Sequence, residues 1–277
     1  MNKIKRQHYV PKFYLNEFTL NNNGQLFVLN KDTNKIFCKN ILEVCEQNYY
    51  YSHKDNMNKC NEYNFLVEEM LSKKEHEFSL IFDKIISNIE GYYYYSKDID
   101  MLTRKERLIF LEFLYYQILR VPKYIDRLFV KGKIFLKELN KKHNYIQNDK
   151  EKINDLKKIM FPILFDNIDE FVSIMNKRNW AFFIINKSIN KYFVSSDNPV
   201  IIANSEFNVD RVGIIDSMTE VTIPISKNIL LAIRETYIKH KIECHIINSI
   251  DIINKINIKI KNNSTRFVYS ELECLLK

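Results

Sequence analysis

The stretch Gln7-His8-Tyr9-Val10-Pro11-Lys12-Phe13-Tyr14-Leu15-Asn16-Glu17-Phe18 gathers more chemically specific side chains than any other part of the sequence. It holds one histidine, one proline and four aromatic rings in twelve positions. Val10-Pro11 favours an extended start, because a residue that precedes proline avoids the helical region. A helix from Pro11 would place Phe13, Tyr14 and Phe18 partly on one face, which we expect to pack in the core.

The composition is that of a folded protein with one large domain or two small ones. Hydrophobic residues make up 46% of the 277 positions, which argues against long disordered segments. Lys and Arg number 42 against 34 acidic residues, so the net charge is +8 and the pI is near 9.0. This excess fits a polyanionic partner such as nucleic acid. It fits more simply a solvated, lysine-rich surface.

The sequence excludes several familiar kinds of site. It has no Gly-rich phosphate loop, which its four glycines make improbable, no His-Glu-x-x-His and no Gly-x-Ser-x-Gly. The cysteines are odd in number and form no Cys-x-x-Cys pair, so we expect neither a disulfide framework nor a zinc knuckle. No apolar run approaches the ~20 residues that span a bilayer, and no signal-peptide core follows the basic N-terminus. These features predict a cytoplasmic protein without a membrane segment.

The pattern along the chain predicts an α+β fold in a single domain, residues 1–277. A helical middle segment, 62–176, is expected to pack with an N-terminal β hairpin and a C-terminal, mainly antiparallel β region. The β-rich parts cover 1–52 and 179–277, the latter with a closing helix. The expected strands are 25–30, 35–38, 48–52, 180–185, 191–195, 200–202, 221–225, 229–233, 245–247 and 266–269, with 180–185 and 191–195 forming a hairpin. The expected closing helix is 250–261, and 53–61, 140–154 and 204–219 are expected to be loops or linkers.

A long helix over 62–90 is expected to carry two aligned carboxylates and to end at Tyr92 to Tyr95. Glu68 and Glu75 lie seven residues, or two turns, apart and therefore share a face beside an apolar stripe. They either reach into a cleft, to bind a cation or to act as acid and base, or belong to a solvated charged face.

The next helix is expected to begin at a capping box of Thr103 and Glu106 and to end at Val121-Pro122. It is apolar on much of its circumference, so Gln117 and Arg120 lie at the end of a buried helix. A buried arginine needs an acid, a carbonyl or an anionic ligand. Arg120 is therefore expected to form a salt bridge to Glu68 or Glu75, to clamp a phosphate or carboxylate, or to do both.

Two polar residues outside these helices each allow a structural and a functional interpretation. His8 is either an edge residue of a packed element or a general acid or base. Asp197 stands in Ser196-Asp197-Asn198-Pro199, which is turn chemistry. Its carboxylate either caps backbone N–H groups or points into a cleft.

Together these stretches resemble the bacterial domain-of-unknown-function family 4238. Members of that family open with His-x-Val-Pro-x-x-Tyr-Leu-x-x-Phe, which residues 8–18 match in full. Its tryptophan strand followed by Ser-Asp-x-Pro is similar to Trp180 followed by 196–199, and its Pro-Leu/Ile-Ser strand is similar to 224–226. Its two spaced glutamates and its helix ended by Arg and Pro are matched more loosely. The resemblance implies a shared role for His8, Glu68, Glu75, Arg120 and Asp197.

Two functions are compatible with these residues. The first is a nuclease or other phosphodiester-cleaving effector of bacterial defence or toxicity. Its candidate catalytic residues are His8, Glu68, Glu75 and Asp197, and its candidate substrate-binding residues are Tyr14, Gln117, Arg120 and Ser196. The three carboxylates are also candidate ligands of Mg²⁺ or Mn²⁺. The alternative is a non-catalytic module that senses a nucleotide, a nucleic acid or a phage protein, in which the same residues form a buried network.

Overall fold

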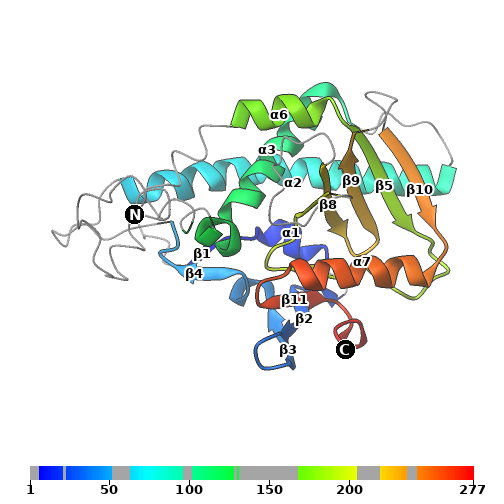
Figure 1. The fold of residues 1–277 in the computed structure, drawn as a ribbon, viewed down its shortest axis with the longest axis horizontal. Coiled ribbons are helices and arrows are strands. Elements are labelled where there is room, and N and C mark those ends of the chain that lie inside the picture. The colour runs from blue at the N-terminus through cyan, green and yellow to red at the C-terminus, as the bar shows by residue number, and fades with distance from the viewer. Residues whose placement is uncertain are drawn as a thin grey trace.

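The computed structural model describes residues 6–20, 23–51, 63–95, 102–127, 130, 168–204, 219–235 and 242–277. These residues form helices and sheets in the predicted α+β order, with antiparallel N-terminal strands, a helical middle and a mainly antiparallel C-terminal sheet (Figure 1). The expected loops at 53–61 and 140–154, and nearly all of the one at 204–219, lie outside the described residues. So does most of the helical pattern expected after Pro122.

The N-terminal region contains the predicted hairpin and one strand pair that was not predicted. Its elements are β1 (Arg6–His8), α1 (Lys12–Asn16), β2 (Gln25–Asn30), β3 (Lys35–Asn40), the 3-10 helix η2 (Ile41–Glu43) and β4 (Glu46–Asn48). β2 and β3 pair antiparallel, as expected, and β4 pairs antiparallel with β1. The strand expected at 48–52 is wrong, because extended structure ends at Asn48. Tyr49 takes a φ of 52°, a left-handed conformation that does not continue a strand.

The helices of the middle region are α2 (Tyr63–Tyr95), α3 (Arg104–Arg120) and α6 (Ile168–Asn176). The capping box of α3 is confirmed: Glu106 N donates to Thr103 Oγ1 at 3.3 Å, and Thr103 N donates to Glu106 Oε2 at 2.8 Å. α2 is longer than expected, because the tyrosines at 92–95 continue the helix instead of ending it. Tertiary contacts hold this last turn, since Tyr93 Oη donates to Asn186 Oδ1 and accepts from Lys187 N.

The C-terminal region forms a five-stranded sheet in the order β10-β5-β9-β8-β7. Its strands are β5 (Asn179–Ile185), β7 (Ile201–Asn204), β8 (Thr219–Ser226), β9 (Ile229–Arg234) and β10 (Ile242–Ile247). Among these described strands, β10 and β5 run parallel, and the other neighbouring pairs run antiparallel. The closing helix α7 (Ile250–Asn263) lies over one face of this sheet, and α2 lies behind the other (Figure 1).

The hairpin expected between 180–185 and 191–195 is wrong. β5 is flanked by β9 and β10, whereas β6 (Ser195–Ser196) pairs with β11 (Phe267–Ser270). Backbone N–H groups in the segment where the hairpin was expected donate instead to carbonyl oxygens of the turn between β8 and β9. Ile185 N donates to Asn228 O and Phe193 N donates to Lys227 O.

A second sheet, in the order β3-β2-β11-β6, joins the two ends of the chain. One hydrophobic cluster likewise draws side chains from all three regions, including Tyr14, Phe113, Trp180 and Tyr269. Ring contacts run through it, with the Phe82 and Phe113 centroids 4.8 Å apart. Since burying each large apolar side chain contributes about 1.5–3 kcal/mol, this cluster fixes α1 firmly against α2 and α3.

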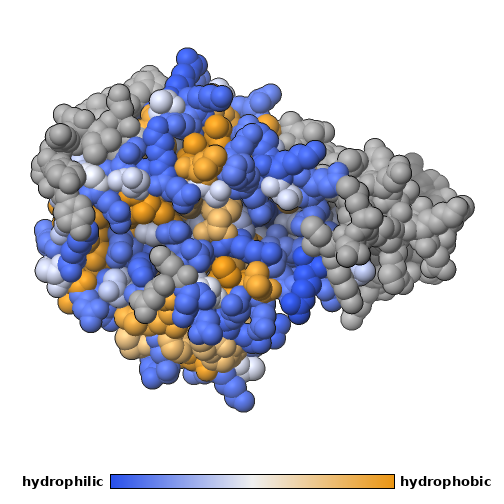
Figure 2. Space-filling model, turned by 180° about the vertical axis from the view of Figure 1, so that it is seen from behind, coloured by the Kyte–Doolittle hydropathy of each residue, from blue (hydrophilic) through white to orange (hydrophobic). Residues whose placement is uncertain are grey.

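The surface opposite to the view of Figure 1 is mainly hydrophilic, with hydrophobic residues in separate patches (Figure 2). Within the described ranges, no helix combines the length and apolar character needed to cross a membrane. Much of this hydrophilic surface reflects the high proportion of charged residues, 27% of the chain.

Candidate functional site

Two of the predicted site residues, Tyr14 in the N-terminal motif and Ser196 in the Ser-Asp-x-Pro turn, lie in the core. Tyr14 is fully buried, and its hydroxyl shares a hydrogen bond of 2.9 Å with Ser195 Oγ. Ser196 is also buried, and its Oγ accepts from Asn198 N at 3.2 Å. Tyr14 and Ser196, two of the four predicted substrate-binding residues, are therefore occupied by contacts that tie α1 and the Ser-Asp-x-Pro turn into the core.

Asp197 holds the connection between α7 and β11. Its Oδ1 accepts from Thr265 N at 2.8 Å, and its Oδ2 accepts from Arg266 N at 2.7 Å and from Phe267 N at 3.0 Å. The residue is 4% exposed. Burial raises the pKa of its carboxyl, and the three N–H donors oppose that shift. This geometry corresponds to the backbone-capping interpretation rather than to a carboxylate in a cleft.

Replacing Asp197 by Asn is expected to destabilise the protein by about 2 kcal/mol, because an amide has one acceptor oxygen and would turn an NH₂ donor toward buried N–H groups. Chemical denaturation of the two proteins would measure the loss. Asp83→Asn is the control, since Asp83 is exposed on α2 and its change should stay within about 0.5 kcal/mol. Equal stability of the Asp197 variant and the wild type would contradict a capping role.

Arg120 organises a second group of polar residues, which we call the Arg120 cluster: His8, Glu68, Glu75, Gln117 and Arg120. Arg120 is 2% exposed, although it is charged. Its Nη1 donates to Glu75 Oε1 at 2.9 Å, which confirms the predicted salt bridge between α2 and α3. Its Nε donates to Gln117 Oε1 at 3.2 Å, and Gln117 Nε2 donates to Tyr9 O at 3.1 Å. The cluster thus binds both helices to the N-terminal motif.

One nitrogen of the buried Arg120 guanidinium, Nη2, lacks a hydrogen-bond acceptor in the part of the chain that the structure describes. Arg120 Nη2 is itself buried and meets no acceptor in good hydrogen-bond geometry among the described residues. The Tyr51 hydroxyl does lie beside the guanidinium, whose charge opposes the rise that burial causes in the pKa of Tyr51. A buried donor without an acceptor is unfavourable by about 1–3 kcal/mol, and by more when it is charged. Because Glu75 keeps 31% of its side chain exposed, the arginine lies just below the surface and is not deep in the core.

Glu68 is the acid of the cluster that titrates near neutral pH. Burial raises the pKa of its carboxyl to about 7, and the negative charge of Glu75 adds to this shift. The positive charges of Arg120 and Lys12 oppose it. A carboxyl group with this pKa exists as acid and as base in comparable amounts at physiological pH, as general acid–base catalysis requires.

His8 is held neutral. Burial lowers the pKa of its imidazole to about 4, and the nearby charges of Lys12, Arg120 and Arg6 act in the same direction. A hydrogen bond with the backbone at Ile41 opposes them. Its Nε2 is buried without a partner among the described residues. The cluster therefore contains two unsatisfied ring or guanidinium nitrogens, on His8 and on Arg120.

Sequence reasoning missed the tyrosines that support the cluster. Tyr50 Oη donates to Arg120 O at 2.8 Å, and Tyr51 Oη donates to His8 O at 3.1 Å. Tyr51 N also donates to Gln7 Oε1 at 2.7 Å. The run of three tyrosines in a polar stretch was a signal, but a strand was the wrong interpretation of it. Lys12 was a second missed residue, and its charge acts on both His8 and Glu68.

The geometry does not support the predicted three-carboxylate metal site. Asp197 uses both oxygens on backbone N–H groups, and Glu75 directs Oε1 to Arg120. Among the described residues, no group of three or more His, Cys, Asp or Glu side chains is arranged to hold a metal ion. Asp197 is therefore engaged with the backbone, and the expected Mg²⁺ or Mn²⁺ site on Glu68, Glu75 and Asp197 stays a prediction.

Taken together, the fold and the cluster define an α+β protein with a nearly buried arginine–carboxylate site where the N-terminal motif meets two packed helices. The family described as a protein of unknown function (DUF4238) matches residues 6–273. The chain belongs to this family, as the His-x-Val-Pro and Ser-Asp-x-Pro motifs predicted. No curated protein and no solved structure gives a significant match.

Proposed function

We propose that the protein is a nuclease, acting in bacterial defence or as a toxin, that hydrolyses a phosphodiester at the Arg120 cluster. The observation that carries this proposal is the pairing of an unsatisfied Arg120 Nη2 with a carboxyl group, Glu68, whose pKa is about 7. The first is a donor for a phosphate oxygen, and the second is an acid–base group suited to neutral pH.

The charge around the cluster favours an anionic substrate. Lys12 is exposed on α1, and Arg120 lies below the carboxylates of α2. Glu75 balances one charge, but a doubly hydrogen-bonded guanidinium with a free Nη2 still prefers a phosphate to a neutral group. The net charge of +8 would also attract a polyanion to the surface as a whole.

Each residue then has a role in hydrolysis. Arg120 Nη2 donates to a non-bridging phosphate oxygen and stabilises the charge that grows there in the transition state. Glu68 in its carboxylate form takes a proton from a water molecule, whose oxygen forms a bond to phosphorus as the P–O ester bond breaks. Neutral His8 orients that water through Nε2, the leaving oxygen on the opposite side of phosphorus takes a proton from solvent, and Glu68 releases its proton to solvent afterwards. Glu75 and Gln117 hold the guanidinium in position.

A non-catalytic sensing module is the second candidate, and the burial of the network favours it. Gln117 is 1% exposed and Arg120 and Tyr51 are each 2% exposed. Polar networks that are this well enclosed often fix a fold. A module of this kind would bind a nucleotide, a nucleic acid or a phage protein without turnover.

The deciding experiment is incubation of the purified protein with single-stranded DNA, duplex DNA, RNA and mononucleotides, each with Mg²⁺, with Mn²⁺ and with a chelator. The nuclease proposal predicts cleavage that Glu68→Gln removes and Glu69→Gln keeps, since Glu69 is the exposed neighbour on the same helix. Binding should weaken steeply with salt, because phosphate contacts release counterions. Tight binding without product in any condition would favour the sensing module. If the protein neither binds nor cleaves any of these molecules, both proposals are contradicted.

A further inference from the structure

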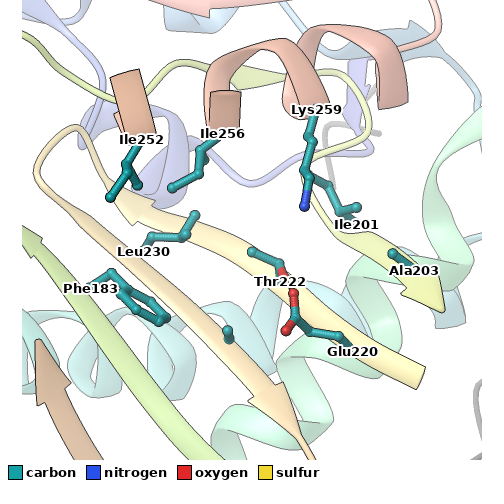
Figure 3. A pocket seen from close by; sticks show the side chains of 10 residues that line it. Phe183, Ile201, Ala203, Glu220, Thr222, Leu230, Ile252, Ile256 and Lys259 are labelled. Atoms are coloured by element: carbon teal, nitrogen blue, oxygen red, sulfur yellow. Dashed lines mark hydrogen bonds between the residues drawn. The ribbon is translucent and has the colours of Figure 1, made fainter. Parts of the chain in front are cut away.

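A cavity of about 230 Å³ lies between α7 and the outer face of the five-stranded sheet (Figure 3). Alternate residues of β8 and β9 point to this face because successive side chains of a strand point to opposite sides. Small side chains cause the hollow, since Ala203 on β7 and Ala232 on β9 do not reach the helix above them. The larger side chains of α7 and β5 close it at the other end.

Most of the lining is apolar. Ile252 and Ile256 descend from α7 toward Phe183 and Leu230 on the sheet (Figure 3). Leu230 is 3% exposed, so the floor of the cavity belongs to the packed core. For scale, an engineered apolar cavity of about 150 Å³ in another protein binds benzene. This cavity is large enough for a ring or a branched chain together with a small polar head group.

Two opposite charges stand at one end of the apolar lining. Lys259 extends from α7 toward the sheet, and Glu220 lies beside Thr222 on β8 (Figure 3). Thr222 Oγ1 donates to Glu220 Oε1 at 3.1 Å, which leaves the other carboxylate oxygen available. Lys259 is an exposed residue, and across the described ranges it makes no hydrogen bond or ion pair with Glu220 or with any other residue. The cavity therefore presents an ammonium group and a carboxylate that do not neutralise each other.

We propose that this cavity binds a free apolar α-amino acid, such as phenylalanine or leucine. The α-carboxylate would pair with Lys259, the α-ammonium group with Glu220, and the side chain would occupy the apolar part. A purely apolar ligand would leave both charges without partners. An anionic amphiphile would satisfy Lys259 but place its negative charge near Glu220. A zwitterion with an apolar side chain is complementary to the whole lining.

The test compares three ligands of one shape by isothermal titration calorimetry with the full-length protein. L-Phenylalanine carries both charges, 3-phenylpropanoate lacks the ammonium group, and 2-phenylethylamine lacks the carboxylate. We expect each analogue to bind about tenfold more weakly than L-phenylalanine, because each loses one charge-assisted hydrogen bond. Lys259→Met should remove the difference between L-phenylalanine and 2-phenylethylamine. Glu220→Gln should remove the difference between L-phenylalanine and 3-phenylpropanoate.

Two further variants locate the site and control for surface charge. Ala203→Phe fills the cavity from β7 and should abolish binding while the unfolding temperature stays close to that of the wild type. Lys255→Met removes an exposed lysine of α7 that does not line the cavity, and should leave binding unchanged. The proposal is overturned if no ligand binds the wild type, if 3-phenylpropanoate binds as tightly as L-phenylalanine, or if binding survives Ala203→Phe.

Discussion

Replacing Glu68 by Gln is expected to slow phosphodiester hydrolysis by about a hundredfold or more, the usual contribution of a positioned general base. The reason is that Gln keeps the size of Glu68 but cannot take a proton from water. Initial rates on the best nucleic-acid substrate, measured beside Glu69→Gln, would give the factor. Comparable rates for the two variants would exclude Glu68 as the base.

The pH dependence adds a second readout to this prediction. Because the pKa of Glu68 is about 7, wild-type activity should rise as pH increases through neutrality and level off above it. Residual activity of Glu68→Gln should lack this rise. A wild-type profile that is flat between about pH 6 and pH 8 would assign the proton transfer to another group.

The stability of Glu68→Gln tests the pKa itself, independently of activity. The folded-state pKa of Glu68 is raised from 4.5 to about 7, so its contribution to stability is fully present below about pH 4.5 and is lost as pH rises through about 7. The stability of the wild type relative to Glu68→Gln should therefore decrease from about pH 5 to about pH 8. His8 has the opposite sign, because its pKa is lowered from 6.5 to about 4. Comparison with the variant is needed, since the two effects oppose each other in the wild type.

Arg120→Ala is expected to reduce the free energy of unfolding by about 2–3 kcal/mol, because charged hydrogen bonds and buried packing are lost together. The value lies below the 3–5 kcal/mol typical of a fully buried ion pair, since Glu75 retains 31% of its exposure and can be solvated again. Gln117 Oε1 would also lose its donor. Urea denaturation, read by the fluorescence of the buried Trp180, would measure the change.

Three further variants distinguish the loss of the Arg120 contacts from the loss of any arginine of α3. Arg104→Ala, at the exposed opposite end of α3, should change stability by no more than about 0.5 kcal/mol. A double-mutant cycle with Glu75→Gln should show a coupling energy of about 1 kcal/mol or more. His8→Ala should leave stability much less affected than Arg120→Ala but remove activity. An equal loss of stability in the His8 and Arg120 variants would instead indicate that the cluster is a structural network.

The parts of the fold that local chemistry determines were predictable from the sequence. The limits of α3 follow from the capping box at Thr103 and from Pro122, and β2 follows from a short apolar run that begins beside a turn. The salt bridge of Arg120 was predictable for a different reason. A charged residue at the end of an apolar helix needs a partner, and the helix before it in the chain supplied Glu75.

The grouping of the functional candidates was only partly predictable. His8, Glu68 and Glu75 do lie around Arg120, since the charges of Arg120 and Glu75 act on the pKa values of their neighbours. Asp197 was expected in the same site because its motif resembles that of the family. Its carboxylate instead holds three backbone N–H groups of the strand that follows α7. The Ser-Asp-x-Pro motif is specific to the family, but the role that the structure gives its aspartate is to cap backbone N–H groups.

The sequence by itself determined where α3 begins and ends, and that Arg120 would be buried with an acid. Only the tertiary structure decided that β6 pairs with β11 and not with β5, and that Tyr50 and Tyr51 support the Arg120 cluster. The two groups of features depend on interactions over different distances along the chain. Caps and periodicity depend on neighbours within one or two turns, whereas strand partners and buried hydrogen bonds depend on which distant segments arrive to satisfy the same backbone and side-chain groups.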